Sequence, residues 1–415
     1  MFKRISLAVA LFASALLVHG AGYSLYSESA TDVLSLGGAT VARTGSASSA
    51  WYNPAATTEI DGTMISVGGT FLRLGAEYKT STGSDHMKNR FRPTGFMYAV
   101  VPVADDMRFT LSMNAPYGTI TQWKRGSQVD TMGTFTSIRG IYVTPGLAIR
   151  LNDQWSVGFG LNGVMAIAEL QRYIDLNKVM PGLGKNKLNL EADALGFGGF
   201  LSVHYRPTED WAFGAHIQTP VQLSAEGDAS YRKSSAAFGG LLNFTKDDVH
   251  ANLTFPGYIA LGMENKSFEN LTLLCDVVWT QWSVFDQLDI HFDSMPGTGG
   301  VGMSRSEHKY HDTFSFRFGA EYKLNENWVI RGGYMRDIGA ANSRYRAPIM
   351  PDSSKHLFSI GAGYHTEKWG VDVAYGYSLF DQEKLGTAMA HEYGVERGEF
   401  NTDVHLLSAQ LTYRF

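Results

Sequence analysis

The chain has 415 residues and a formal net charge of −5, from 35 Lys and Arg residues against 40 Asp and Glu residues. It has no basic tract, so nucleic acid is not expected as a partner. Cys275 is the only cysteine, which excludes intramolecular disulfides and multi-cysteine metal sites. The chain contains 45 glycines and is 13% aromatic but only 18% charged, and its glycines and aromatic residues recur at alternate positions, which indicates long amphipathic strands.

Residues 1–20 have the pattern of a secretory signal peptide. Lys3 and Arg4 precede an uncharged apolar run over residues 5–18, which is shorter than the about 20 residues that a membrane-spanning helix needs. We expect cleavage after Gly20. No later apolar run reaches spanning length and the mean hydropathy is −0.13, so the pattern argues against a helical membrane protein.

Residues 21–62 precede the first expected strand and are rich in Ala, Ser, Thr and Gly. They carry only five charges and have enough apolar side chains to pack. The motif Asn53-Pro54-Ala55 interrupts the segment. A disordered leader is the alternative. Because small residues suit a segment threaded through a narrow lumen, we expect this segment to be a compact plug, here called the hatch.

In residues 63–415, apolar and polar side chains alternate with a period of two residues, which predicts β-strands. At the C-terminus, Leu407, Leu411 and Phe415 share one face, while Gln410 and Arg414 share the other. The same alternation recurs over residues 314–322 and 371–379. Apolar outer and polar inner faces on long strands are typical of a transmembrane β-barrel. A soluble β-sandwich is the alternative, but it would place charged residues outside and apolar residues between its sheets.

Six short turns rich in Asp, Asn and Pro separate the strands, at residues 102–106, 151–154, 206–210, 264–270, 324–327 and 365–368. Longer polar stretches alternate with them, near residues 80–90, 124–133, 174–190, 227–249, 293–308, 338–353 and 381–400. Short periplasmic turns and long outer loops are typical of bacterial outer-membrane barrels. With both chain ends in the periplasm, six turns predict an all-β barrel of fourteen antiparallel strands, whose lumen must be open or plugged.

The third expected strand, within residues 107–123, contains an irregularity. Its alternation holds up to Met113 and then fails around Pro116, which cannot donate a ladder hydrogen bond. A bulge that adds one residue reverses the faces in this way. In hydrocarbon, unpaired backbone groups are costly, so a break here is tolerated only where it lines a cavity.

Five segments carry a resemblance to a known family. They are "AGYSLYSESATDVLSLGGA" (21–39), "NPA" (53–55), "VVWTQWSVFDQL" (277–288), "HDTFSFRFGAEYKLNENWVIRGGY" (311–334) and "PIMPDSSKHLFSIGAGY" (348–364). On these segments the whole mature sequence resembles the FadL family of outer-membrane transporters of hydrophobic compounds. The resemblance implies a fourteen-stranded barrel closed by an N-terminal hatch.

The resemblance also implies a function, namely passive uptake of long-chain fatty acids or, in relatives, of aromatic hydrocarbons. Such ligands would settle in an apolar pocket in the lumen and leave sideways into the membrane after the hatch shifts. The family has an inward kink in its third strand that opens the barrel wall. Tyr117 and Gly118 match that kink, so the resemblance implies a lateral opening at Ala115, Pro116, Tyr117 and Gly118.

In fatty-acid-transporting relatives a basic pair meets the ligand carboxylate. Arg172, in "ELQRYID", matches one member, and strand parity points its side chain inward. The second member is Lys in the relatives, whereas this chain has His311, whose imidazole is only partly charged at neutral pH. Either Arg172 holds the carboxylate largely alone, or the ligand is not a carboxylate. In the alternative interpretation, Arg172 is one of several lumen-facing charges, such as Arg317, Glu321 and Arg331.

The remaining expectations follow from this interpretation. We expect a monomer in contact with outer-membrane lipid and lipopolysaccharide, with no cofactor. We expect no metal site, because "HKYH" at 308–311 alone is a weak signal. No motif for an activated nucleophile or a catalytic carboxylate pair stands out, so an enzyme is not expected. A general diffusion porin and an aromatic hydrocarbon importer remain as alternatives.

Overall fold

The computed structural model describes residues 24–88, 91–175, 185–232, 246–293, 303–350 and 352–415. The expected signal peptide lies outside these residues. Within them, no helix is long and apolar enough to span a membrane.

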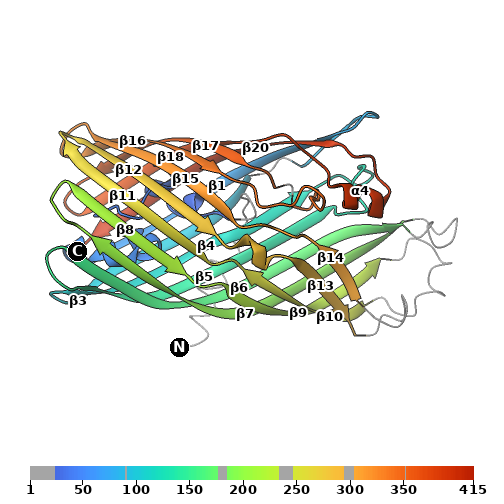
Figure 1. The fold of residues 1–415 in the computed structure, drawn as a ribbon, viewed down its shortest axis with the longest axis horizontal. Helices are drawn as coiled ribbons and strands as arrows, with labels where there is room; N and C mark the ends of the chain where they lie inside the picture. The colour runs from blue at the N-terminus through green and yellow to red at the C-terminus, as the bar shows by residue number, and fades with distance from the viewer. Residues whose placement is uncertain (1–23, 89–90, 176–184, 233–245, 294–302, 351) are drawn as a thin grey trace.

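The chain forms a closed antiparallel β-barrel of fourteen strand positions, which confirms the predicted fold (Figure 1). Four of these positions are each divided into two strands. In order around the wall, the positions are β1 (Met64–Lys79), β3 (Phe91–Ala104), β4 (Met107–Gln122), β5 (Phe135–Arg150), β6 (Trp155–Asp175), β7 (Lys185–Tyr205), β8 (Trp211–Gln218) with β9 (Val221–Arg232), β11 (Tyr258–Phe268) with β10 (Lys246–Phe255), β12 (Leu271–Thr280) with β13 (Gln287–Phe292), β15 (Thr313–Lys323) with β14 (Met303–Glu307), β16 (Trp328–Asp337), β17 (Lys355–His365), β18 (Trp369–Phe380) and β20 (Glu399–Arg414). Pairing of β1 with β20 closes the barrel.

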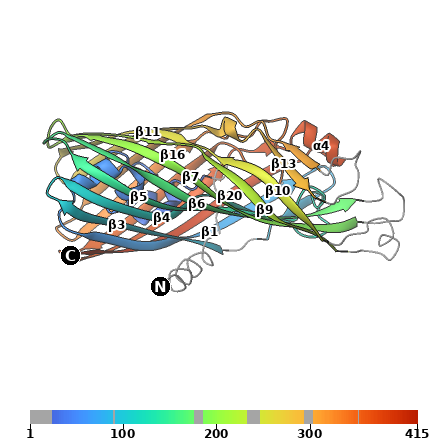
Figure 2. The ribbon, with the colours of Figure 1, turned by 90° about the horizontal axis from the view of Figure 1, so that it is seen from below.

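All six predicted short turns lie between consecutive wall strands, at the end that also carries the C-terminus (Figures 1 and 2). The opposite end differs from the prediction. β6 and β7 remain paired as far as Asp175 and Lys185, so residues 174–175 and 185–190 of the loop expected at residues 174–190 are strand. Strand ends that extend beyond the membrane need no apolar face. They therefore lack the alternation of apolar and polar residues on which the strand prediction depends. The expected loop 381–400 contains a short strand, β19 (Glu383–Lys384), and a helix, α4 (Thr387–Tyr393).

The two faces of the wall are as the alternation predicts. On β15, Phe314, Phe316 and Phe318 are 49%, 41% and 50% exposed on the outside, while Ser315 and Arg317 are both 4% exposed on the inside. Apolar side chains exposed in a continuous band are stable only against lipid. The chain is therefore a protein of the outer membrane.

The hatch fills the lumen near the short-turn end, where both views show the blue N-terminal segment inside the barrel (Figures 1 and 2). Its described part contains four short helical segments, namely η1 (Ser27–Ser29), α2 (Thr31–Leu34), α3 (Ser49–Tyr52) and η2 (Pro54–Glu59). Leu25, Val33, Trp51 and Tyr52 are all at most 2% exposed. The hatch is thus a packed element, as expected, and not a disordered leader.

Candidate functional site

An apolar cavity lies on the inner face of the wall, toward the loop end of the barrel. It has a volume of about 140 Å³ and is lined largely by carbon, including Ile138, Leu190, Leu253, Ile290 and Phe292. These residues come from β5, β7, β10 and β13, so neighbouring strands converge on one space. A hydrocarbon chain would be removed from water here.

Arg172 of β6 lies on the rim of this cavity, as its strand parity predicts. Its Nη1 donates a hydrogen bond of 3.2 Å to the Tyr393 hydroxyl in α4. Burial raises the pKa of the Tyr393 phenol, against the opposing effect of the guanidinium, so this partner stays neutral. Among the described side chains, no carboxylate oxygen lies within 4.0 Å of the Arg172 guanidinium. Arg172 therefore has no close ionic partner among the described residues, although Glu169 of the same strand also lines the cavity.

His311 does not share the cavity with Arg172. It is exposed and lines a separate hollow with Asn342 and Glu383. His308 occupies the cavity instead, 3% exposed and with its Nε2 lacking a hydrogen-bond partner among the described residues. Its ring stacks on Phe285 at 4.4 Å. In the sequence, the "HKYH" segment suggests no role for His308 other than a weak metal motif. In the described part of the chain no cluster of His, Cys, Asp or Glu could hold a metal ion.

A row of aromatic rings connects the cavity to the third wall strand. Phe285 lines the cavity and contacts Tyr310 at 5.1 Å, and Tyr310 contacts Trp282 at 6.2 Å. Tyr117 of β4 lies 6.2 Å from Trp282 and 5.2 Å from Phe255. The row depends on breaks in the wall, because η5 (Trp282–Val284) and the segment 308–312 interrupt their strands and turn these rings inward.

β4 contains the bulge that its broken alternation predicts. Its ladder to β5 pairs Asn114 with Tyr142 and then Tyr117 with Gly140, so β4 has one extra residue. Its other ladder, to β3, ends at the pair Met97 and Met113. The edge of β4 beyond Met113 therefore has no ladder to β3, although Lys88 N donates to Gln122 O further along.

The first described residues of the hatch lie against this free edge. Ser24 forms an antiparallel bridge with Tyr117, and Leu25 N donates a hydrogen bond of 2.7 Å to Pro116 O. The Tyr117 hydroxyl donates to Pro256 O at 2.8 Å, across the lumen side of the wall. The hatch thus supplies the backbone partner that β3 does not provide.

The Asn53-Pro54-Ala55 motif holds the middle of the hatch to the wall. The Asn53 side-chain amide donates to Val41 O at 2.7 Å and to Val203 O at 3.0 Å. Ala55 N donates to Ser202 Oγ, and Pro54 begins η2, where a missing N–H costs nothing. The motif therefore connects two parts of the hatch with β7.

Buried ion pairs fix another part of the hatch. Arg43 lies 2.6 Å from Asp32 of the hatch and 2.9 Å from Glu321 of β15. Arg331 of β16 pairs with the same Glu321 at 2.6 Å and with Asp372 of β18 at 2.6 Å. Ser24 and Leu25 carry no ionisable side chain, so the first described residues of the hatch are held by backbone contacts and not by ion pairs.

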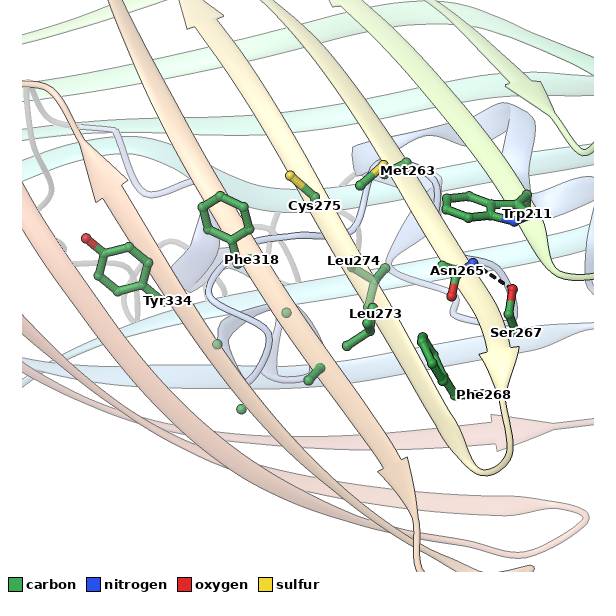
Figure 3. A pocket seen from close by; sticks show the side chains of 14 residues that line it. Trp211, Met263, Asn265, Ser267, Phe268, Leu273, Leu274, Cys275, Phe318 and Tyr334 are labelled. Carbon is green, nitrogen blue, oxygen red and sulfur yellow. Dashed lines mark hydrogen bonds between the residues drawn. The ribbon is translucent and has the colours of Figure 1, made fainter.

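A second hollow, of about 710 Å³, lies on the outer wall across β8, β11, β12, β15 and β16 (Figure 3). Exposed Trp211, Met263, Phe268 and Phe318 line it, together with half-buried Cys275. Since these side chains belong to the lipid-facing band, the hollow contacts the bilayer and is separate from the luminal cavity.

Comparisons with known proteins agree with this architecture. Residues 10–415 match the family model described as outer membrane protein transport protein (OMPP1/FadL/TodX). The long-chain fatty acid transport protein of Escherichia coli K12 is 23% identical over 362 residues, covering 78% of this chain and 80% of that protein. A putative outer membrane protein of Neisseria meningitidis serogroup B is 24% identical over 447 residues, covering 96% and 95%.

Two solved structures show the same fold. The Pseudomonas aeruginosa FadL homologue superposes with a TM-score of 0.82 at 21% identity, over 93% of this chain and 98% of that one. The toluene transporter TodX of Pseudomonas putida superposes with a TM-score of 0.75 at 16% identity, over 94% and 99%. At these identities the likeness establishes the fold and leaves the ligand open.

Proposed function

Because this chain belongs to the outer membrane protein transport protein family (OMPP1/FadL/TodX), we propose that it takes up long-chain fatty acids passively across the outer membrane, as a transporter and not as an enzyme. The observation that carries the proposal is the end of the β3–β4 ladder at Met97 and Met113, beside an edge whose bulged part contacts the first described residues of the hatch.

The cavity and Arg172 fit the two ends of a fatty acid. Each buried CH₂ group contributes about 0.8 kcal/mol, so an acyl chain enters an apolar cavity without an external energy source. The Arg172 guanidinium can form two parallel hydrogen bonds with a carboxylate. This division supports a long-chain carboxylate as the ligand.

The proposed route leads from the cavity past the aromatic row to Tyr117. Displacement of Ser24 and Leu25 would uncover the edge of β4 at Ala115–Gly118, and the ligand would leave between β3 and β4 into the bilayer. The Asn53-Pro54-Ala55 motif and the Arg43 ion pairs would keep the body of the hatch in place meanwhile.

A reversible crosslink tests this route. In a chain with Cys275→Ser, the pair Ser24→Cys and Tyr117→Cys faces across one antiparallel bridge, a distance that a disulfide spans. Oxidation is expected to lower initial fatty-acid uptake by at least about tenfold, because the gate cannot move. Reduction of the same protein should restore uptake, and this comparison cancels the effect of the substitutions. Equal uptake in both states would rule out the lateral route.

An aromatic hydrocarbon importer is the second candidate. The aromatic lining of the route and the placement of His311 outside the cavity favour it. Competition between palmitate and toluene for the purified protein separates the two candidates. Displacement by palmitate at far lower concentration supports the fatty-acid function, whereas displacement by toluene alone supports the hydrocarbon.

A further inference from the structure

We propose that Arg317 is a second carboxylate-binding residue, which the Tyr26 ring covers while the hatch is closed. It would receive the fatty-acid headgroup between the cavity and the opening in the wall. The inference rests on the proposed function for its ligand class, and it assigns a site that lies apart from Arg172.

Arg317 is a buried cation without a direct ionic partner. It points into the lumen from β15 and is only 4% exposed. Its Nε donates to Ser315 Oγ at 3.1 Å, while its Nη1 has no hydrogen-bond partner in the described part of the chain. No described carboxylate oxygen lies within 4.0 Å of its guanidinium nitrogens, in contrast to Arg43 and Arg331, each of which pairs with two carboxylates.

Two acidic side chains lie in the neighbourhood of Arg317, each beyond 4.0 Å from its guanidinium and each held in part by another group. Asp276 lies opposite Arg317 in the β12–β15 ladder, and its Oδ2 accepts hydrogen bonds from Thr40 N at 2.6 Å and Val41 N at 2.9 Å, while its Oδ1 has no hydrogen-bond partner among the described residues. Asp337 lies 3.7 Å from the Lys355 ammonium. These carboxylates compensate the positive charge of Arg317 only over a distance, and neither forms an ion pair with its guanidinium group. Buried guanidinium groups are normally paired, so an anionic ligand is the natural partner.

Tyr26 covers the guanidinium. The Arg317 Cζ lies 3.8 Å from the centroid of the Tyr26 ring, a cation–π contact. Tyr26 directly follows Leu25, which holds the edge of β4 through Pro116 O. The Tyr52 hydroxyl also donates a hydrogen bond of 2.7 Å to Tyr26 O, so the ring leaves Arg317 only if the movement that frees this edge extends to Tyr26 and breaks that bond. In the proposed open state the opening of the wall would thus coincide with the exposure of a positive charge on the lumen side of β15.

The exchange is chemically favourable for a carboxylate. A bidentate guanidinium–carboxylate pair is stronger than the contact of a guanidinium with a phenol ring. A fatty-acid anion could replace the ring and hold the hatch open while its tail passes toward β4. A neutral alcohol or hydrocarbon of equal length would gain little at this point, so Arg317 would select for acids.

Binding to purified protein tests the inference separately from transport. The background is Arg172→Ala, which removes the first proposed carboxylate contact. Tyr26→Leu uncovers Arg317 and is expected to strengthen palmitate binding by about tenfold, while hexadecanol binding changes by less than about twofold. Adding Arg317→Met should abolish this gain, and Arg317→Lys, which keeps the charge but not the fork, should retain part of it.

The outcomes are distinct. A gain for palmitate that survives Arg317→Met, or an equal gain for palmitate and hexadecanol, would overturn the assignment. Loss of both ligands in Arg317→Met, with the barrel still folded by heat-modifiable migration on a gel, would show a structural role and also overturn it. If palmitate binds as expected but wild-type cells take up no fatty acid, the proposed function fails while the site stands.

Discussion

Arg172 brings a positive charge into an apolar cavity where its hydrogen-bond partner is the neutral Tyr393 phenol. The face on which its side chain lies could be predicted, because β6 is continuous from Trp155 to Asp175 and side chains therefore alternate between the two faces along it. His311 could not be placed in this way. The segment 308–312 interrupts the strand, and the break brings His308 into the cavity while His311 faces another hollow.

This difference gives a prediction for two single substitutions. Arg172→Ala should lower the initial rate of fatty-acid uptake by about tenfold or more, since a hydrogen-bonded charged pair contributes about 1.5–3 kcal/mol. His311→Ala should change it by less than about twofold, because its side chain lies outside the cavity. Uptake of labelled oleate into cells of equal outer-membrane protein content measures both. Wild-type rates in the Arg172 variant across several pH values would contradict the assignment.

At the scale of elements, the bulge in β4 and the hatch segment beside it form one unit. The bulge is readable from local sequence, because Pro116 and the reversed alternation both mark it. The segment that fills the free edge is not, since the contact of Ser24 with Tyr117 joins positions that are far apart in the chain. The alternation of side chains and the residue types in turns are local features of the sequence, so they do not predict a contact between distant positions.

Removal of the extra residue should close the wall. Deletion of Ala115 leaves one β4 residue opposite Ile141, so the registers on both sides of the bulge become continuous. We expect normal assembly, protection of β4 amides from hydrogen exchange up to Gln122, and loss of most fatty-acid uptake. Pro116→Ala, which keeps the extra residue, is the matched control and should retain uptake. Full transport by the deletion variant would show that the bulge is not part of the route.

At the scale of the whole molecule, the barrel and the hatch depend on different interactions. The barrel closes by the β1–β20 ladder from Met64 and Arg414 to Lys79 and Glu399, which involves no hatch residue. Its strand number follows from six turns that the sequence marks plainly. The division of four wall positions into two strands each could not be predicted from the sequence. A short break such as Pro256-Gly257 has the same local sequence as an ordinary turn, and only the pairing with neighbouring strands distinguishes the two.

The separation of these interactions predicts the effect of removing the hatch. A chain without residues 21–62 should still close its fourteen strands, because the ladders between wall strands involve no hatch residue. Its lumen should then admit water, since a barrel of this size is not filled by its own wall side chains. In liposomes, swelling in small sugars is expected to be rapid for the deletion variant and negligible for the wild type. Rapid swelling of the wild type would indicate a diffusion porin, and slow swelling of a folded deletion variant would show that the hatch is not what closes the lumen.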